Sequence, residues 1–364
     1  MALLAAAEPA SRSVPTRPAT AAPVSGRLAS LPVTRILGVE FVPLREGAAM
    51  LGLKTMVAES PRKFILADPP VRVELEADSR EMAVNGLRVF LGDPTVWRGG
   101  QLYMSRIDFE RRLTPMVRPA FGPACPPPPR VIALDPGHGL PDNGFENEKF
   151  DLKERILTLD VAQRLKKLLE AKGYRVVLTR TDDRALSPEK KIDFPLRDQV
   201  ANRASADLFV SIHFNSLFPD TKTSGTEIYT FAPRMQHAAD WWGDTRKEDP
   251  DVEREEASVN RYDFWSVVLA QALHRSVLAS LRTADRGAKL KHLGVLRNLD
   301  CPGVLVESVF LSNDGEAKRA ATPAYRQQIA EALAAGIGAY AGTLETLRPK
   351  PVAPPAASPQ SSDP

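Results

Sequence analysis

The sequence predicts an α/β protein in which a mostly parallel sheet with helices on both faces follows a small β-rich module. Between about residues 130 and 343, apolar runs of strand length alternate with longer segments whose apolar residues recur at helical spacing. This alternation is typical of a parallel sheet with crossover helices. Before it, short alternating strands are broken by turn signals such as Asn85-Gly86. The two patterns predict two different parts of one chain.

The composition narrows the class of protein. The chain has 364 residues, with 48 Lys and Arg against 45 Asp and Glu, and a formal net charge of +3. This near balance argues against nucleic acid as the main partner, and we expect none. Hydrophobic residues make up 43% of the chain, which is enough for a large core and a smaller one. No apolar run reaches the roughly 18 to 20 residues of a membrane-spanning helix, so we expect no integral membrane segment.

Proline-rich stretches divide the chain. Residues 1–31 and 344–364 are rich in Ala, Pro and Ser, and this composition predicts disordered segments. The run "PACPPPP" predicts a Pro-rich linker over 121–129. It separates a β-rich accessory module at 32–120 from a larger domain at 130–343.

The first residues, "MALLAAAEPASR", leave two interpretations open. The apolar run and the small residues after it are those of the end of a signal region, but the run is short and no basic residues precede it. Either the true start lies upstream, or these residues are an ordinary Ala-rich disordered leader. On the first interpretation, we expect the signal peptide to be missing or incomplete in this chain.

The elements of the larger domain follow in order. The run "RVIALD" predicts a strand, and Leu157, Val161 and Leu165 belong to a helical pattern that ends at Gly173. The later segments predict, in order, the strand "YRVVLTR", the helix "LRDQVANRAS", the strands "DLFVSIH" and "GTEIYTF", a helix over Phe264 to Leu281, the strand "PGVLVES" and a helix from about Ala324 to Tyr340.

Four polar residues lie where these elements begin or end. His138 follows the strand "RVIALD", His213 closes the strand "DLFVSIH", and Glu307 ends the strand "PGVLVE". Glu154 lies at the start of the first helix. Because the carboxyl ends of parallel strands line the ligand crevice of an open α/β sheet, we expect the four side chains to meet at one edge.

This set of residues predicts a catalytic metal site. Two imidazoles and one carboxylate, His138, His213 and Glu154, with an open fourth position are the ligands of a catalytic zinc ion. Zinc lowers the pKa of a bound water to about 7, and a separate carboxylate can move the proton to a leaving amine. Glu307 is the candidate for that proton transfer.

The motifs resemble one family of enzymes. They are "ALDPGHG", "LKERILTLDVAQRLKKLLEAKGYRVVLTR", "RDQVANRASADLFVSIHFNS", "SGTEIYTF" and "LGVLRNLDCPGVLVESVFLSN", in this order. Together they resemble the zinc-dependent N-acetylmuramoyl-L-alanine amidases (amidase type 3, cell-wall hydrolases). The resemblance implies zinc ligands at His138, Glu154 and His213, and a catalytic Glu307.

The resemblance also implies a function and a place. The expected reaction is hydrolysis of the amide between N-acetylmuramic acid and L-alanine of peptidoglycan, for cell-wall remodelling or daughter-cell separation. The implied location is periplasmic or extracellular, in the cell envelope, and an activator protein is a further implied partner. The segment "MAVNGLRVFLGDPTVWRGGQLYMSRIDFERRL" resembles the small N-terminal domain of copper amine oxidases, which implies an accessory or wall-binding module.

Several alternatives stay open. Glu146 and Glu148 compete with Glu154 for the role of the ligand, although Glu154 has the better register with the following helix. Leu140 and Ser216 depart from the usual family pattern and put the shape of the cleft in question. The alternative functions are a non-catalytic or gated peptidoglycan-binding protein with the same fold, and a zinc peptidase that cuts within the stem peptide.

Two residues are candidates for supporting roles. Asp135 either accepts the second N–H of His138, as partners of zinc-bound histidines do, or only forms a turn. Asn215 is expected to fix the loop after His213 through side-chain bonds to the backbone. Cys125 and Cys301 leave a disulfide open. The acidic stretch Pro233 to Asn260 is interpreted as a solvated loop or as an inhibitory lid over the metal.

Overall fold

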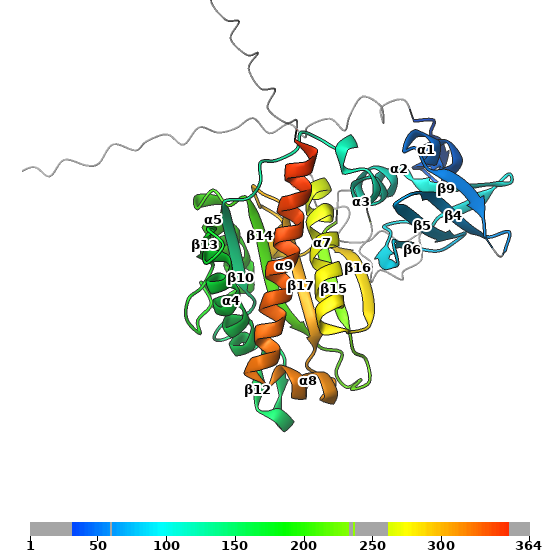
Figure 1. The fold of residues 1–364 in the computed structure, drawn as a ribbon. Helices are drawn as coiled ribbons and strands as arrows, with labels where there is room; N and C mark the ends of the chain where they lie inside the picture. Colours follow the sequence, from blue (N-terminus) through cyan, green and yellow to red (C-terminus); the bar gives the residue numbers. More distant parts are fainter. Residues whose placement is uncertain (1–30, 59, 233–235, 237–260, 349–364) are drawn as a thin grey trace, which may run out of the picture.

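The structure is a computed structural model that describes residues 31–58, 60–232, 236 and 261–348 (Figure 1). The expected leader and most of the expected tail lie outside the described residues. So does the stretch Pro233 to Asn260 apart from Gln236, and with it the hypothesis of a lid. In the described helices, no segment is both long and apolar enough to cross a membrane.

The N-terminal module is a small, mainly antiparallel β structure. It contains β1 (Thr34–Ile36), β2 (Val39–Pro43), α1 (Leu44–Met50), β3 (Lys54–Val57), β4 (Lys63–Asp68), β5 (Val71–Glu76), β6 (Glu81–Val84), β7 (Leu87–Phe90), β8 (Val96–Arg98), β9 (Gln101–Ser105), α2 (Arg106–Asp108), η2 (Phe109–Leu113), α3 (Thr114–Val117) and η3 (Pro119–Phe121). The alternation expected from the sequence is clear in β5, where every second residue is buried. Asn85 and Gly86 both have positive φ and make the expected tight turn between β6 and β7.

The larger domain alternates strands and helices as predicted. It contains β10 (Val131–Pro136), β11 (Glu146–Asn147), η4 (Glu148–Phe150), β12 (Leu152–Lys153), α4 (Glu154–Glu170), β13 (Arg175–Leu178), α5 (Lys190–Arg203), β14 (Leu208–Asn215), β15 (Thr226–Phe231), α7 (Asp263–Leu281), β16 (Asp285–Lys291), η5 (Gly294–Leu296), β17 (Gly303–Phe310), α8 (Asp314–Ala320) and α9 (Pro323–Leu347). Helix α9 begins where the Thr322 hydroxyl accepts from the Tyr325 N–H and Pro323 takes the first position. It runs past Tyr340 to Leu347, farther than the sequence predicts.

The central sheet is mostly parallel within the larger domain and antiparallel within the module. Its order is β13-β10-β14-β17-β15-β16-β7-β6-β5-β4-β3. The pairs β10–β13, β10–β14 and β14–β17 are parallel, whereas β15 runs antiparallel to β17. The predicted α/β class is therefore confirmed.

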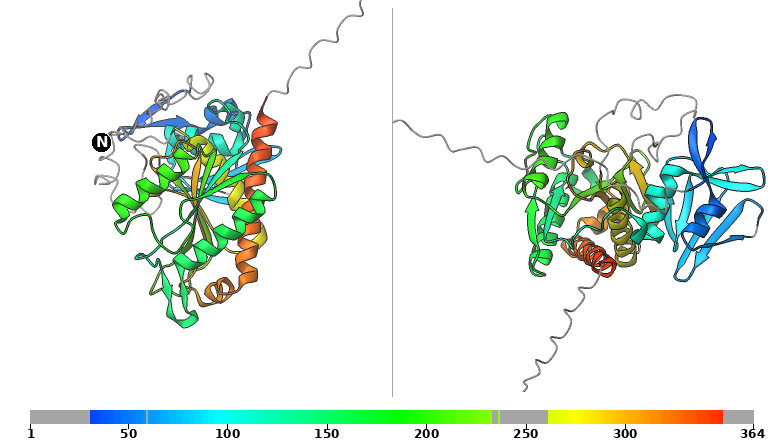
Figure 2. Two further views of the ribbon diagram at one scale, coloured as in Figure 1. Left: turned by 90° about the vertical axis from the view of Figure 1, so that its left-hand side faces the viewer. Right: turned by 90° about the horizontal axis from the view of Figure 1, so that it is seen from above.

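The sheet continues from the larger domain into the module. Strand β16 pairs with β7 at Ala288 and Val89, so the module lies beside β16 (Figures 1 and 2). Arg112 of η2 is buried there and donates to the carbonyl oxygens of Phe90 and Ala288 and to the Thr230 hydroxyl. The division at 121–129 stays a prediction, but the parts on either side of it share one sheet.

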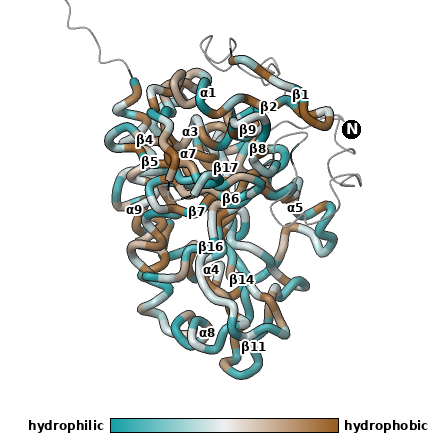
Figure 3. The backbone as a smooth tube through the Cα atoms, turned by 90° about the vertical axis from the view of Figure 1, so that its right-hand side faces the viewer, coloured by the Kyte–Doolittle hydropathy of each residue, from teal (hydrophilic) through white to brown (hydrophobic). Residues whose placement is uncertain are grey.

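Helices cover the two faces of the sheet unequally. Helices α4, α7 and α9 cover one face and share its large apolar core, whereas α5 and η5 cover the other face over a smaller core (Figures 1 and 2). Apolar segments gather in the middle of the chain trace, and the turns around α8 are mainly hydrophilic (Figure 3).

Side chains alternate between the two faces along β14. Val210 and Ile212 belong to the large core, while Phe209 belongs to the smaller one. His213 has the parity of Phe209, so it lies on the face that α5 covers. On β17, Leu305 belongs to the same smaller core, which places Glu307 on that face as well.

Candidate metal centre

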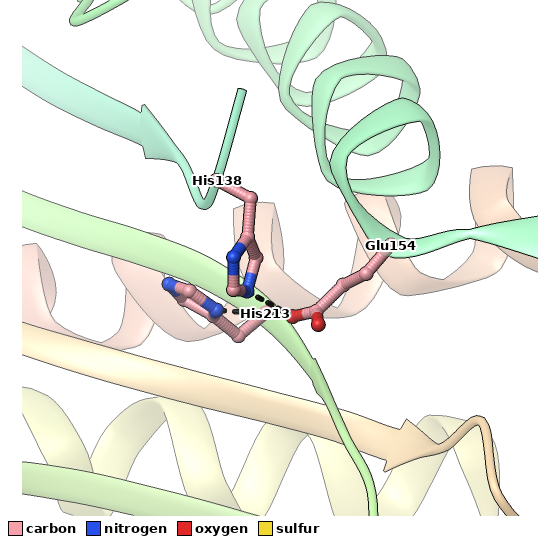
Figure 4. Close-up of side chains that lie close together, drawn as sticks. All are labelled: His138, Glu154 and His213. Carbon is pink, nitrogen blue, oxygen red and sulfur yellow. Dashed lines mark hydrogen bonds and ion pairs between the residues drawn. The ribbon is translucent and has the colours of Figure 1, made fainter. Parts of the chain in front are cut away.

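Three side chains from three separate segments meet at the carboxyl ends of the parallel strands. His138 comes from the loop after β10, Glu154 from the start of α4, and His213 from β14 (Figure 4). Their ligand atoms all lie within 4.8 Å of one another. The structure thus brings together the three residues that the sequence predicts as ligands.

Glu154 lies at the centre of this group. Its Oε1 atom is 3.0 Å from His138 Nε2 and 3.0 Å from His213 Nδ1. The backbone N–H groups of Phe145 and Phe214 donate to its two oxygens. Burial raises the pKa of Glu154, but its bonds to the two imidazoles outweigh burial and leave the pKa below its usual value. The carboxylate is therefore held charged and in a fixed orientation.

Asp142 holds the imidazole ring of His138. Its Oδ2 atom is 2.9 Å from His138 Nδ1, and the Lys190 ammonium lies 2.9 Å from the same oxygen. Burial raises the pKa of Asp142, but the bonds from Lys190 and His138 bring it down to about 2. A charged acceptor on Nδ1 leaves Nε2 free to face the other two side chains.

The interpretation of Asp135 as the partner of the His138 ring is wrong. Asp135 is buried in the sheet and accepts from the hydroxyls of Thr179 and Ser211 and from Arg197. Arg197 in turn donates to the backbone oxygen of His138 at 2.6 Å. Asp135 thus supports the backbone of the loop through Arg197, whereas Asp142 contacts the ring. The sequence signal for Asp142 was its place four residues after His138 in the same loop.

Two glycines make room for the group. At Gly137, a Cβ atom would overlap the ring of His213. At Gly144, where φ is +65°, a Cβ atom would press on the Glu154 carboxylate. His138 itself has a φ of 63°, a left-handed conformation that turns its side chain back toward β14. The loop is therefore built around the positions of these side chains.

Glu307 lies on the strand next to His213. The two residues face each other in the parallel register of β14 and β17, and Glu307 lines the same cavity as the three candidate ligands. Its Oε2 atom is buried without a hydrogen-bond partner among the described residues. Burial, together with the charges of Glu154 and Glu227, raises the pKa of Glu307 well above its usual value, while Lys291 opposes this effect.

Asn215 has the expected bond to the backbone and a second bond that was not expected. Its Oδ1 atom accepts from the Ser216 N–H at 2.8 Å, and its amide donates to Glu227 Oε2 at 2.9 Å. Glu227 is buried and also binds Arg286 and Lys289, each at 2.8 Å. Glu227 was not predicted, although a glutamate within the predicted strand "GTEIYTF" was a signal.

The other candidates lie outside the group. Glu146 and Glu148 are exposed and are not among the three gathered side chains, so the geometry favours Glu154. Cys301 is buried among apolar residues, and Cys125 and Cys301 are both free thiols. Of the other histidines, His274 is fully buried on α7, and His237 lies outside the described residues.

A cavity of about 340 Å³ opens onto the group. The residues that line it include the three candidate ligands and Glu307, together with the apolar Phe194, Leu293 and Val295. Two imidazole nitrogens and a buried carboxylate at one end of a cavity are a donor set that fits a divalent metal ion with an open position. The group is consistent with a metal site of the kind found in zinc amidases.

Comparison with known proteins identifies the family. The Amidase_3 family, described as N-acetylmuramoyl-L-alanine amidase, matches residues 132–339. The amidase AmiC of Escherichia coli O6:H1 is 30% identical over 259 residues, or 66% of this chain and 60% of that protein. The germination-specific amidase of Bacillus subtilis is 30% identical over 220 residues, or 58% of this chain and 79% of that protein.

A solved structure, the amidase AmiC2 of Nostoc punctiforme, is 27% identical and covers 58% of this chain and 96% of that chain, with a TM-score of 0.46. The alignment with AmiC of E. coli covers about 60% of the length of that relative. The family does not extend over the N-terminal module, whose resemblance to a copper amine oxidase domain stays a prediction. Because the family match covers more than half of the residues, the chain belongs to the Amidase_3 family of N-acetylmuramoyl-L-alanine amidases.

Proposed function

We propose that this protein hydrolyses the amide bond between the lactyl group of N-acetylmuramic acid and L-alanine in peptidoglycan. The observation that carries the proposal is the set of His138, Glu154 and His213 beside the buried Glu307, at one end of a cavity in a chain of this family. Three grouped metal donors and a separate carboxylate are what metal-assisted amide hydrolysis requires.

The metal we propose is zinc, held by His138, Glu154 and His213. The mixture of two imidazoles with one carboxylate favours zinc over magnesium or calcium, which prefer oxygen donors. When bound, zinc supplies a Lewis acid that polarises the scissile carbonyl and makes a water molecule more acidic. Asp142 fixes the ring of His138, and the bonds from Phe145 and Phe214 fix the carboxylate of Glu154.

Glu307 is the proposed proton carrier. A carboxylate takes a proton from water and returns it to an amine most effectively when its pKa lies near the working pH. Burial beside Glu154 and Glu227 shifts the pKa of Glu307 in that direction. The hydrolysis then leaves the proton on the nitrogen of L-alanine, which departs as an amine.

The proposed place of action follows from the substrate. Membership of a cell-wall amidase family implies the cell envelope. We propose a periplasmic or extracellular location within it, with peptidoglycan as the partner and an activator protein as a regulator.

The test is product analysis on purified sacculi, with the zinc-loaded protein. Mass spectrometry should find stem peptides with a free L-alanine amine, and E307Q should lower the rate by about 100-fold or more while it keeps stoichiometric zinc. Wall binding without any release would support the non-catalytic alternative. New amines within the stem peptide would support a peptidase, and loss of zinc in E307Q would make Glu307 a ligand.

A further inference from the structure

One loop supplies part of the apolar lining of the cavity. It runs from residue 292 to residue 300, between β16 and β17, and includes the short helix η5. Leu293, Gly294 and Val295 of this loop line the cavity, so we call residues 292–300 the lining loop. Val295 is at the same time buried in the smaller core. The position of the lining loop therefore contributes directly to the shape of the cavity.

One face of α5 holds the lining loop. Phe194, Asp198 and Asn202 follow one another at intervals of four residues, so they lie on the same side of the helix. A Cβ atom at Gly294 would come within 2.7 Å of the Phe194 ring, so the backbone of the loop lies directly against that ring. The contact between this face and the loop therefore sets where the cavity lining lies.

Two polar side chains of this face bind the backbone of the lining loop. The Asn202 amide donates to the carbonyl oxygen of Asn298 at 2.7 Å, and its side-chain oxygen accepts from the Asp300 N–H at 2.9 Å. Asp198 Oδ2 accepts from the Asn298 N–H at 3.2 Å. Both side chains thus hold the same stretch of the loop, but of the two only Asp198 can gain or lose a proton.

Asp198 is a costly residue to place under this loop. It is 1% exposed, and its Oδ1 atom is buried without a hydrogen-bond partner among the described residues. An asparagine would accept the same bond without the cost of a buried charge. Burial and the charge of Asp135 raise the pKa of Asp198 to about 8, although the Asn298 N–H and the charge of Arg297 oppose this effect. With the loop in place, the acid is therefore mostly uncharged at neutral pH.

Charged or titratable groups from several elements surround Asp198. They are Asp135 of β10, Arg197 of α5, Arg297 of the lining loop and Cys301 just before β17. Asp135 is itself paired with Arg197, and burial raises the pKa of the Cys301 thiol, so the thiol stays neutral. His292 of the lining loop lies against the ring of Phe231 instead. Asp198 is the carboxyl group of this set that is bonded to the loop backbone, so its ionisation is coupled to the position of the loop.

The direction of this coupling follows from proton binding. With the loop in place the pKa of Asp198 is about 8, whereas the pKa of an aspartate exposed to water is about 4. A loop that moves away lets water reach Asp198, so the displaced state binds fewer protons than the closed state. The ratio of displaced to closed loop should therefore rise with pH from about 4 to about 8, by up to about tenfold for each pH unit, and then level off.

We propose that Asp198 is a positioning residue for the substrate: its uncharged acid holds the lining loop against Phe194, and loss of the proton releases the loop and weakens substrate binding. The effect on binding rests on the proposed function, because the bound molecule is then peptidoglycan. The effect on the loop does not depend on that function. Asp198 is not among the residues that line the cavity, so the chemical step at Glu307 should be unaffected while the loop is closed.

Hydrogen exchange tests the loop directly. The full zinc-loaded chain is compared with D198N, which keeps an oxygen acceptor for the Asn298 N–H but cannot ionise. After correction for the intrinsic effect of pH, exchange of the backbone N–H groups of the lining loop should rise by about tenfold or more between about pH 5.5 and 7.5 in the wild type. In D198N it should stay nearly constant over the same range.

Two further variants separate ionisation from the loss of contacts. N202A removes two bonds to the lining loop but no titratable group, so it should raise exchange of the loop by a similar factor at every pH. E316Q is the matched control, because Glu316 is also a buried acid whose pKa is raised by burial, but it binds the backbone of Gly225 and Phe310. It should leave the exchange of the lining loop unchanged.

Steady-state kinetics on a synthetic muramyl peptide tests the effect on binding. The wild type and D198N share the zinc site and Glu307, so the effects of pH on these groups cancel in the ratio of the two proteins. The KM of the wild type should equal that of D198N at about pH 6 and exceed it by about threefold or more at about pH 9, as expected when about a third of the molecules keep the loop closed. The ratio of kcat values should stay near one.

The possible outcomes keep the two proposals apart. An equal rise of loop exchange with pH in the wild type and D198N would refute the coupling, while the amidase function stands. Equal KM values at about pH 9 would refute the role of Asp198 in substrate binding, even if the exchange differs. If the wild type releases no amine from the peptide, the proposed function fails, and a difference in exchange would still support Asp198 as the residue that holds the loop.

Discussion

Replacement of Asp142 by Ala should weaken zinc binding without loss of the fold. The change removes the acceptor that lies 2.9 Å from His138 Nδ1. A hydrogen bond to a charged group contributes about 1.5–3 kcal/mol, and loss of such a partner from a zinc-bound histidine costs about 10- to 100-fold in affinity. The Asp142 side chain is 29% exposed and Lys190 shares it, so water and the lysine weaken the bond. We therefore expect the lower end of the range, about tenfold.

The assay is competition for zinc with a chromophoric chelator, with the wild type, D142A and D142N compared at one pH. D142N keeps an oxygen acceptor without the charge and should lie between the other two. D151N is the matched control, since Asp151 is exposed on the same loop and its left-handed conformation tolerates Asn. Equal affinity of D142A and the wild type, with unchanged circular dichroism, would refute the role of Asp142.

Two further predictions concern stability. R112A removes three hydrogen bonds at the junction of β7 and β16, two of which join the module to the larger domain. Because these bonds are buried, urea unfolding should show a loss of about 3–5 kcal/mol. A loss of under about 1 kcal/mol would contradict a structural role for Arg112 at this junction. Although burial raises the pKa of Asp135, Arg197 and two hydroxyls together leave it below its usual value. Its charge therefore stabilises the fold above the unfolded pKa of about 4, and this contribution is lost as the pH falls through the lower folded value. The difference in unfolding free energy between the wild type and D135N should be constant from about pH 5 to 7 and shrink at lower pH, and a difference that persists unchanged in acid would exclude this origin.

The residues of the site could be predicted because each follows a strong local signal. Strands β10, β14 and β17 are continuous apolar runs, which is what burial on both faces produces. His138 follows the first of these strands, and His213 and Glu307 lie in the second halves of the other two, so the parallel arrangement brings the three together. The alternation of apolar strands with amphipathic helical segments likewise predicted the parallel sheet of the larger domain.

Strand β16 could not be predicted from its sequence. In "DRGAKLK" the charged residues outnumber the apolar ones, and two of them, Arg286 and Lys289, bind the buried Glu227. The pairing of β16 with the module depends on residues almost two hundred positions apart, Val89 and Ala288, and no local pattern encodes it. The hydrogen bonds of Arg112 at this junction could not be predicted either, because their acceptors Thr230 and Ala288 are far from it in the chain.

The role of Asp142 depends on a chain reversal after His138 that no sequence pattern predicted. Asp135 is nearer to His138 in the chain, but it belongs to the strand and its side chain lies between those of Thr179 and Ser211. The left-handed conformation of His138 then reverses the chain, and two backbone hydrogen bonds pair Gly139 with Asp142. This reversal, rather than distance in the chain, decides which carboxylate reaches the ring.

The N-terminal module adjoins a strand whose last residue lines the cavity. Strand β16 has β15 on one side, where Lys289 contacts the buried Glu227, and β7 of the module on the other. Without β7, β16 would become the edge of the sheet and would expose unpaired backbone groups. Lys291 ends this strand and lines the cavity. The position of this end of the cavity is therefore set from both sides of β16, by Glu227 within the larger domain and by the module beyond it.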